Sequence, residues 1–244
     1  MRYFIEFSYD GTAYHGWQVQ PNARSVQAEL NRALSLLLRQ EVNTTGAGRT
    51  DAGVHALKMY AHFDAELIES IDQCVYRLNR ILPQDIAVYG IRQVESDSHA
   101  RFDAVSRTYH YFVYTQKNPF RQHYAFRLPY KVDFALMNRA ALELLTIEDF
   151  SSFCKAHSQA HTHICHVEKA EWTEVEPDLW RFEIRADRFL RNMVRAIVGT
   201  LIDVGRGKIS VDDFKEVIAR RDRCAAAESV PGEALFLVDI VYPY

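Results

Sequence analysis

Residues 46–56 read Gly-Ala-Gly-Arg-Thr-Asp-Ala-Gly-Val-His-Ala, so one carboxylate, Asp51, lies between two glycine-flanked turns. Glycine adopts positive φ angles and lets another molecule approach the main chain closely, at an entropic cost that an ordinary connection rarely carries. Arg49 precedes Asp51 by two residues, and a permanently charged guanidinium keeps a nearby aspartate ionised even where water is excluded. This pattern is typical of a carboxylate nucleophile. The structural alternative is a glycine-rich β-turn with a capping aspartate.

Strands and helices are predicted on both sides of this stretch in the first half of the chain. Alternating apolar residues predict strands at 2–10, 42–46, 57–63 and 86–89. Ser25 and Ser70 are the predicted N-caps of two helices whose apolar residues recur at helical spacing. The first half therefore reads β-α-β-β-α-β.

The second half repeats this order. Its predicted elements are a strand at 105–115, a helix at 133–145, strands at 166–175 and 179–187, a helix at 189–203 and a strand at 234–241. An extra helix is predicted from Ser210 to Arg220, because Ser210 and Asp213 have the spacing of a capping box. The repeated order is the ferredoxin-like one. We therefore predict an α/β (α+β) protein of two ferredoxin-like halves, residues 1–100 and 101–244, joined into one antiparallel sheet with helices on one face and a central cleft as the site.

The composition indicates a soluble globular protein. Hydrophobic residues make up 48% and charged residues 25% of the 244 residues, and no apolar run is long enough to span a membrane. The N-terminal residues lack the features of a secretory signal, which favours a cytoplasmic location. Four cysteines without a CxxC pair indicate reduced, buried thiols and not a disulfide framework.

The charge pattern gives two opposing indications about a nucleic-acid partner. A net charge of −3 argues mildly against one, since phosphate neutralisation supplies most non-specific affinity. Arginine nevertheless dominates the 29 basic residues, and its planar fork suits phosphate contacts and base stacking. Four arginines cluster within a short stretch, namely Arg185, Arg188, Arg191 and Arg195. The alternative interpretation of this cluster is a solvated helix face.

A second group of chemically versatile residues lies between positions 154 and 166. Its six potential metal ligands are Cys154, His157, His161, His163, Cys165 and His166. Their spacing matches neither paired CxxC knuckles nor a zinc finger. We therefore predict no metal site and interpret the segment as a polar surface loop that contacts RNA.

The stretch 46–56 resembles the active-site signature of the TruA family of tRNA pseudouridine synthases. Further family landmarks follow in family order over essentially the whole chain. They are Tyr9-Asp10-Gly11-Thr12, Tyr14-His15-Gly16-Trp17-Gln18, Leu82-Pro83, His99-Ala100-Arg101-Phe102-Asp103-Ala104, Arg107-Thr108-Tyr109, Phe189-Leu190-Arg191-Asn192-Met193-Val194-Arg195 and Val241-Tyr242-Pro243. The second half matches weakly outside residues 189–195, and Ala234 stands where the family usually has a glycine before the last strand.

The resemblance implies roles for individual residues. Asp51 is the expected catalytic nucleophile, acting on a uridine that is flipped out of the RNA. Tyr109 matches the family's base-stacking tyrosine and shares a strand face with Tyr111 and Val113, so it is expected to stack on the uracil and to take part in catalysis. The resemblance suggests that Arg195, on a helix with an apolar inner face, is the ion-pair partner of Asp51.

Further substrate contacts are expected from basic residues. Arg49 is expected to contact the phosphate of the flipped nucleotide or to hold the base out. His55 is a weaker neighbour, for which a turn-stabilising role is the alternative. Three arginines of the landmarks complete the expected binding set, namely Arg101, Arg107 and Arg191.

By the same resemblance the substrate is tRNA, at uridines 38, 39 and 40 of the anticodon stem and loop, and the enzyme is a homodimer with an RNA-binding cleft. No metal or organic cofactor is expected, because the uracil ring is itself electrophilic at C6 and the reaction is an isomerisation. Attack of Asp51 at C6 of the base and attack at C1′ of the ribose both stay open. Two other classes of function are an RNA-binding module without catalysis and a histidine-site metalloenzyme.

Overall fold

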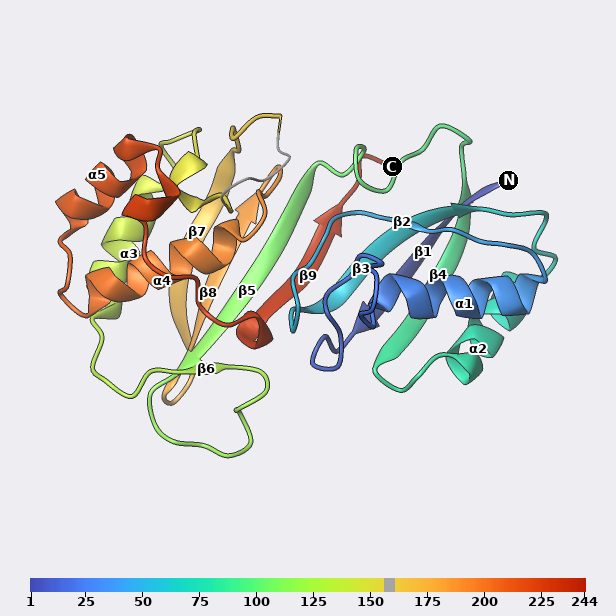
Figure 1. Cartoon of the computed structure of the whole chain (residues 1–244), viewed down its shortest axis with the longest axis horizontal. Coiled ribbons are helices and arrows are strands. Elements are labelled where there is room, and N and C mark those ends of the chain that lie inside the picture. Colours follow the sequence, from blue (N-terminus) through green and yellow to red (C-terminus); the bar gives the residue numbers. More distant parts are fainter. Residues whose placement is uncertain (156–160) are drawn as a thin grey trace. The chain divides into compact units, whose positions relative to one another are not determined.

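The computed structural model of the chain describes residues 1–155 and 161–244 (Figure 1). These residues form a mixed α/β protein with five α-helices and nine strands, and most strand pairs are antiparallel. They divide into two compact units. Unit 1 comprises Met1–Val105 and Phe236–Tyr244, and unit 2 comprises Ser106–Leu235.

Unit 1 has the predicted order β-α-β-β-α-β. Its elements are β1 (Arg2–Tyr9), α1 (Val26–Leu38), β2 (Thr45–Gly46), β3 (His55–Asp64), α2 (Ile71–Ile81) and β4 (Ile86–Val94). The strands lie in the order β4-β1-β3, with antiparallel pairing throughout, and the short β2 pairs with β3. The strand predicted at 234–241 is β9 (Leu235–Val241), which pairs in parallel with the start of β3 through Phe236 and Leu237.

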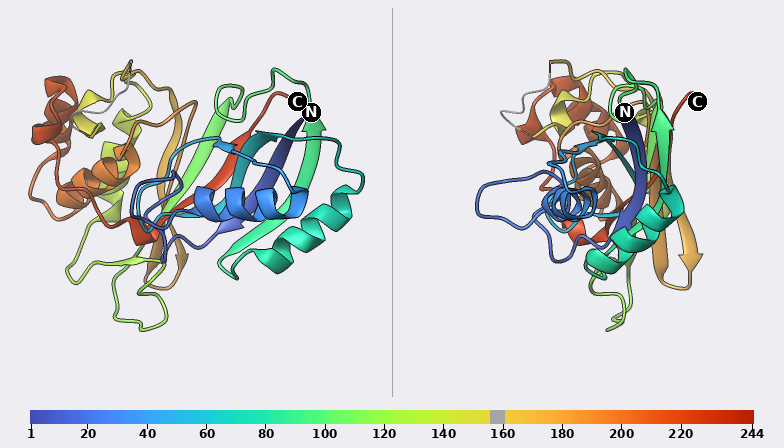
Figure 2. Two further views of the ribbon diagram at one scale, coloured as in Figure 1. Left: turned by 45° about the vertical axis from the view of Figure 1, so that its right-hand side comes forward. Right: turned by 90° about the vertical axis from the view of Figure 1, so that its right-hand side faces the viewer.

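The core of unit 1 follows from alternation on β1 and from the apolar stripe of α1. Tyr3, Ile5 and Phe7 are buried on β1, whereas Glu6 between them is partly exposed. The hydroxyl of Ser25 accepts a hydrogen bond from Ala28 N at 3.3 Å and so caps α1 as predicted. Figure 2 shows α1 lying along one face of these strands.

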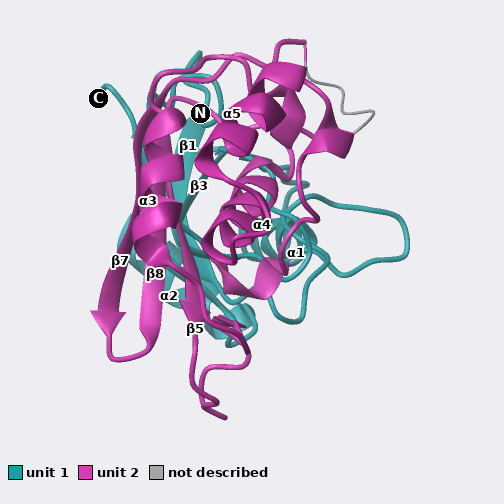
Figure 3. Ribbon diagram, turned by 90° about the vertical axis from the view of Figure 1, so that its left-hand side faces the viewer, with its two compact units in different colours: residues 1–105, 236–244 teal, residues 106–235 magenta. Residues whose placement is uncertain are grey.

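Unit 2 combines three long antiparallel strands and one short strand with three α-helices. Its strands are β5 (Ser106–Tyr114), β6 (Phe126–Arg127), β7 (Val167–Glu176) and β8 (Leu179–Ala186), in the order β5-β8-β7 with β6 beside β5. Its α-helices are α3 (Phe134–Glu143), α4 (Met193–Gly205) and α5 (Val211–Arg220), and three short 3-10 helices are η1 (Ser151–Phe153), η2 (Arg223–Ala225) and η3 (Gly232–Ala234). Figure 3 shows α3, α4 and α5 on one side of β7 and β8.

Side chains fasten α3 to the strands of unit 2. The ring of Phe134 stacks on that of Trp180, with centroids 3.8 Å apart and planes inclined by 2°. The amide of Asn138 replaces a strand partner for Trp172, because it accepts from Trp172 N at 2.7 Å and donates to Trp172 O at 3.0 Å. The two bonds of Asn138 satisfy the main-chain N–H and carbonyl of Trp172.

The start of α4 differs from the prediction. The predicted helix begins at residue 189, but α4 begins at Met193 because Asn192 before it has a positive φ of 68°. Left-handed backbone interrupts an α-helix, so residues 189 and 190 are not helical and residues 191 and 192 form a turn. Eleven of the thirteen residues of α4 are buried, which makes it the central helix of the unit and explains its nearly continuous apolar sequence.

The cysteines are free, and Cys74, Cys154 and Cys165 are buried as predicted. Cys224 is exposed, contrary to the prediction, because it lies in the short η2 turn after α5 and not on a packed face. In residues 1–155 and 161–244, no helix has both the length and the apolar character needed to cross a membrane.

A turn at residues 99–103 is anchored on β3 by a buried histidine. His62 Nδ1 accepts a hydrogen bond from Ala100 N at 3.1 Å, and the His62 ring lies edge-on to that of His99 at 4.6 Å. Burial lowers the pKa of His62 to about 4, and the positive charges of His99 and Arg2 act in the same direction. Protonation of Nδ1 removes the acceptor that holds the turn.

This arrangement predicts a loss of stability in acid. The pKa of His62 is lower in the folded protein than the ordinary value of about 6.5, so the unfolded chain binds the proton more tightly, and the free energy of unfolding falls as the pH drops from about 6.5 to 4. The full shift corresponds to about 3 kcal/mol, and screening by nearby solvent reduces the expected loss to about 1–2 kcal/mol. Urea unfolding of His62→Asn, whose amide oxygen can still accept from Ala100, should show a shallower pH dependence than the wild type. The matched variant His15→Asn, at an exposed position, should keep the wild-type slope. Equal slopes for all three proteins would contradict this assignment.

Candidate active site

The motif loop, residues 46–56, connects β2 to β3 in unit 1. Asp51 is half-buried at its centre, and Arg49 is exposed. Thr50 between them is buried, and its hydroxyl forms a 2.9 Å hydrogen bond with the hydroxyl of Tyr9 on β1. A buried hydroxyl that loses such a partner costs about 1–3 kcal/mol. The charged residues Arg49 and Asp51 therefore flank a residue that is hydrogen-bonded to β1.

Residues 11–17 lie main chain against main chain with the motif loop, and two glycines make this contact possible. A Cβ on Gly11 would collide with the carbonyl oxygen of Val54, and one on Gly16 would collide with that of Thr50. Gly16 also has a φ of +90°, which a residue with a side chain rarely adopts. Any other residue at these two positions would push the motif loop away.

Main-chain hydrogen bonds join the same two segments. Trp17 N donates to Thr50 O at 3.3 Å, and Gly53 N donates to Tyr14 O at 3.2 Å. Gly53 has a φ of 77° and lets the chain turn, so that Val54 N donates back to Asp51 O at 3.2 Å. The main chain on both sides of Asp51 is therefore held by defined partners.

The 11–17 segment is itself fixed to the turn before β4. The Tyr14 hydroxyl donates to Asp85 Oδ1 at 2.5 Å, and burial together with this bond raises the pKa of Tyr14 above its usual range. The guanidinium of Arg24 lies 4.6 Å from the centre of the Tyr14 ring. The support of the motif loop thus extends through Tyr14 to the turn before β4.

His55 lies at the base of the motif loop and is buried. Its Nδ1 accepts a hydrogen bond from Gly11 N at 3.0 Å and lies 3.1 Å from Asp10 Oδ1. In the bond from Gly11 N, the imidazole Nδ1 is the acceptor. The His55 ring stacks on Phe236 at 4.5 Å. These contacts favour the turn-stabilising role that the sequence left open.

Tyr109 lies on β5 of unit 2, opposite Ile184 of β8. Tyr111 and Val113, which share its strand face, are fully buried, whereas Tyr109 is half-buried. Burial on this face of β5 therefore decreases from Tyr111 to Tyr109. The ring of Phe189 meets it edge-on, with centroids 5.0 Å apart and planes inclined by 81°.

Two arginines of unit 2 donate to main-chain carbonyls. Arg107 Nη1 donates to Asp187 O at 2.7 Å. Arg195 Nε donates to Val230 O at 2.7 Å, and Val230 N donates to Arg195 O at 3.3 Å. A planar guanidinium carries five N–H donors, so each of these bonds fixes the position of the charged group and uses only one of them. The ion pair between Arg195 and Asp51 stays a prediction.

The two remaining predicted contacts are exposed. Arg101 lies in the 99–103 turn of unit 1, with its guanidinium 5.7 Å from the centre of the Phe102 ring. Arg191 lies in the turn before α4 of unit 2, where its carbonyl oxygen accepts from Lys155 N at 3.0 Å. Of the predicted site residues, Arg49, Asp51, His55 and Arg101 lie in unit 1, and Arg107, Tyr109, Arg191 and Arg195 lie in unit 2.

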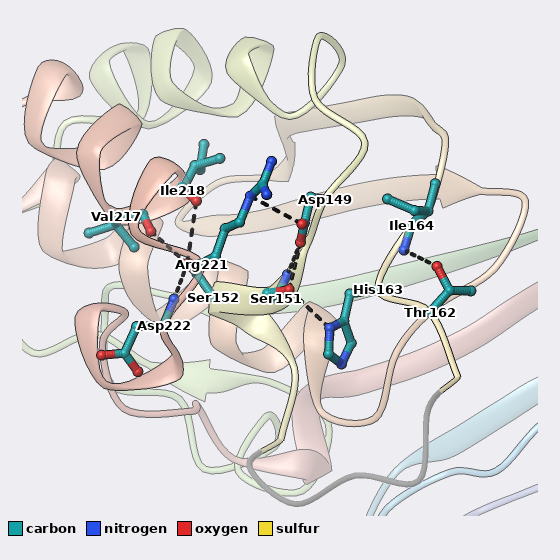
Figure 4. A network of polar contacts seen from close by, with 10 residues as sticks. All are labelled: Asp149, Ser151, Ser152, Thr162, His163, Ile164, Val217, Ile218, Arg221 and Asp222. Atoms are coloured by element: carbon teal, nitrogen blue, oxygen red, sulfur yellow. Dashed lines mark hydrogen bonds and ion pairs between the residues drawn. The ribbon is translucent and has the colours of Figure 1, made fainter.

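The cysteine and histidine segment contains a polar network, which Figure 4 shows in close-up. His163 Nδ1 lies 3.0 Å from the Ser151 hydroxyl, which donates to Asp149 Oδ1 at 2.6 Å, and Arg221 Nε lies 3.1 Å from Asp149 Oδ2. Burial raises the pKa of Cys165 to about 12, so its thiol is neutral. His157 lies outside the described residues. Within the described part of the chain, no three His, Cys, Asp or Glu side chains are grouped as metal ligands.

Sequence reasoning assigned no separate role to Phe189 or Asp187. Phe189 is the aromatic neighbour of Tyr109, and Asp187 accepts from Arg107. The signal available for Phe189 was its position at the start of the landmark 189–195. Its partner became visible only when β5 and β8 were paired.

Comparison with known proteins agrees with these landmarks. A family model described as tRNA pseudouridine synthase matches residues 6–103 and 140–243. A tRNA pseudouridine synthase A of Bacteroides thetaiotaomicron is 56% identical over 244 residues, which cover 99% of this chain and 91% of that protein. The protein of the same name from Bacillus subtilis is 41% identical over 246 residues, with 99% of both chains covered. The chain therefore belongs to the TruA family of tRNA pseudouridine synthases.

Proposed function

We propose that this protein isomerises uridine to pseudouridine in the anticodon stem and loop of tRNA, at positions 38, 39 and 40, with Asp51 as the nucleophile. The observation that carries the proposal is the motif loop, in which Gly11 and Gly16 let residues 11–17 support the main chain around Asp51. Family membership and the names of its relatives support the same reaction.

The reaction breaks the N-glycosidic bond between N1 of uracil and C1′ of ribose and forms a bond from C5 to C1′. The C5 proton leaves, N1 gains a proton, and no electrons enter or leave. The ionised carboxylate of Asp51 starts the reaction by adding either to C6 of the base or to C1′, and it is released when the new bond is complete. The carboxylate must hold one of the two fragments while the base turns, which requires the fixed loop described above.

Other residues of the proposed site hold the substrate. Tyr109 stacks on the flipped uracil, since single unstacked bases are typically bound on aromatic side chains. Arg195 pairs with Asp51, and Arg49 contacts the flipped nucleotide or its phosphate. We further propose that the two ferredoxin-like units form one sheet with a central RNA-binding cleft, and that the enzyme is a homodimer whose tRNA contacts both subunits.

The nucleophile is tested by Asp51→Asn, which keeps the size of the side chain and removes its charge. Tritium release from tRNA labelled at uridine C5 should fall by at least about 1,000-fold, because the amide cannot form the covalent intermediate. Binding of the same tRNA should change by less than about 3-fold, and the exposed Asp72→Asn should behave as wild type. Release that persists in Asp51→Asn would exclude this nucleophile. Tight binding without release by the wild type would favour an RNA-binding module.

The partner of the nucleophile is tested by Arg195→Met, which keeps the aliphatic stem and removes the charge. We expect kcat to fall by about 100-fold, with the melting temperature lowered by only a few degrees because the bond to Val230 O is lost as well. The exposed Arg220→Met on α5 is the matched control. Wild-type turnover by a folded Arg195→Met enzyme would show that this charge does not support Asp51.

A further inference from the structure

We infer that Phe189 is a positioning residue that sets the plane of the Tyr109 ring, a role that rests on the function proposed above. Tyr109 is half-buried on β5, whereas Tyr111 and Val113 on the same strand face are fully buried, so the core encloses only part of the Tyr109 ring. Phe189 restrains this ring directly, since its own ring lies edge-on to it, with centroids 5.0 Å apart and planes inclined by 81°. This is the geometry that aromatic pairs prefer.

Asp187, two residues before Phe189, forms four hydrogen bonds. Asp187 Oδ1 accepts from His166 N at 2.8 Å and from Arg188 N at 2.7 Å. Asp187 N donates to His166 O at 3.1 Å, and Asp187 O accepts from Arg107 Nη1 at 2.7 Å. One aspartate therefore ties the end of β8 to the start of β7 and to β5.

The segment after Phe189 is fixed as well. Arg191 O accepts from Lys155 N at 3.0 Å, and Met193 N donates to Leu190 O at 3.1 Å. Asn192 holds its positive φ while its side-chain amide donates to Ser229 Oγ at 2.5 Å. The turn at 187–192 is thus held at both ends, and its half-buried aromatic residue cannot move away from Tyr109 without breaking these bonds.

The fixed turn explains how β5 can present the half-buried Tyr109 ring as a stacking platform. A tyrosine side chain has two rotatable bonds, and a free surface ring must be ordered each time a base stacks on it. Holding the ring beforehand removes that ordering cost from the bound state, so it increases kcat/KM without any contact between Phe189 and the substrate. Arg107, which was expected to bind substrate, contributes to the same arrangement through Asp187.

The test uses Phe189→Leu, which keeps an apolar side chain of similar reach and removes the ring edge. Tritium release from C5-labelled tRNA should show kcat/KM lowered by about 3- to 10-fold, with an unchanged melting temperature. Phe189→Tyr restores a ring edge and should return to within about 2-fold of wild type. Phe112→Leu removes the edge-on partner of His110 on the same strand and should leave kcat/KM unchanged.

A second pair of variants separates positioning from general structure. Asp187→Asn keeps the Oδ1 acceptor and should behave as wild type, whereas Asp187→Ala removes the two side-chain bonds that hold the turn and should lower kcat/KM as much as Phe189→Leu. The double variant with Asp187→Ala and Phe189→Leu should have a kcat/KM no lower than that of the less active single variant, because both substitutions act through the Tyr109 ring. Additive losses, or wild-type kcat/KM in a folded Phe189→Leu, would overturn the inference. Absence of release by the wild type itself would instead overturn the proposed function.

Discussion

The contact between residues 11–17 and the motif loop is the constraint on which the candidate site depends. Main chain lies against main chain there, and only glycine at positions 11 and 16 leaves room for the carbonyl oxygens of Val54 and Thr50. Because the contact is made by backbone atoms, it has few ways to adjust, unlike a contact between flexible side chains. The buried bond from Tyr9 to Thr50 adds a second fixed point. A carboxylate that must stay aligned through bond breaking and bond formation gains most from such a support.

In unit 2, two of the predicted site residues are held in position by hydrogen bonds from their side chains to main-chain carbonyls. Arg107 and Arg195 each donate to a main-chain carbonyl, of Asp187 and Val230, and the remaining N–H groups of each guanidinium keep a fixed direction. The turn before α4 adds Phe189 to the ring of Tyr109. In both units, therefore, the residues assigned to chemistry are not held by their own side chains alone. Their neighbours in the main chain carry the restraint, which explains why the family landmarks extend several residues beyond each functional position.

Much of this could be predicted from local patterns. Ser25, Ser70 and Ser210 were identified as helix N-caps, and each accepts a main-chain N–H in the structure. Alternation located the strands to within a few residues, because side-chain direction repeats every two residues along a strand. The start of α4 was placed four residues too early, since Phe189 and Leu190 continue its apolar pattern and the positive φ of Asn192 leaves no mark in hydrophobicity. Cys224 was expected to be buried on the strength of residue type, and its η2 turn exposes it.

By itself the sequence determined the order of the longer helices and strands, though not the two-residue β6, together with the motif loop around Asp51 and the family, because these depend on residue types at fixed spacing along the chain. Only the tertiary structure decided which partner each polar group has. It showed that His55 Nδ1 accepts from Gly11, that Arg107 donates to Asp187, and that Phe189 faces Tyr109. These pairs lie between 44 and 80 positions apart, and two of them bind main-chain atoms that every residue possesses, so no residue pattern identifies them. Long-range pairing is set by the register of the strands and the packing of whole elements, and spacing along the chain does not contain it.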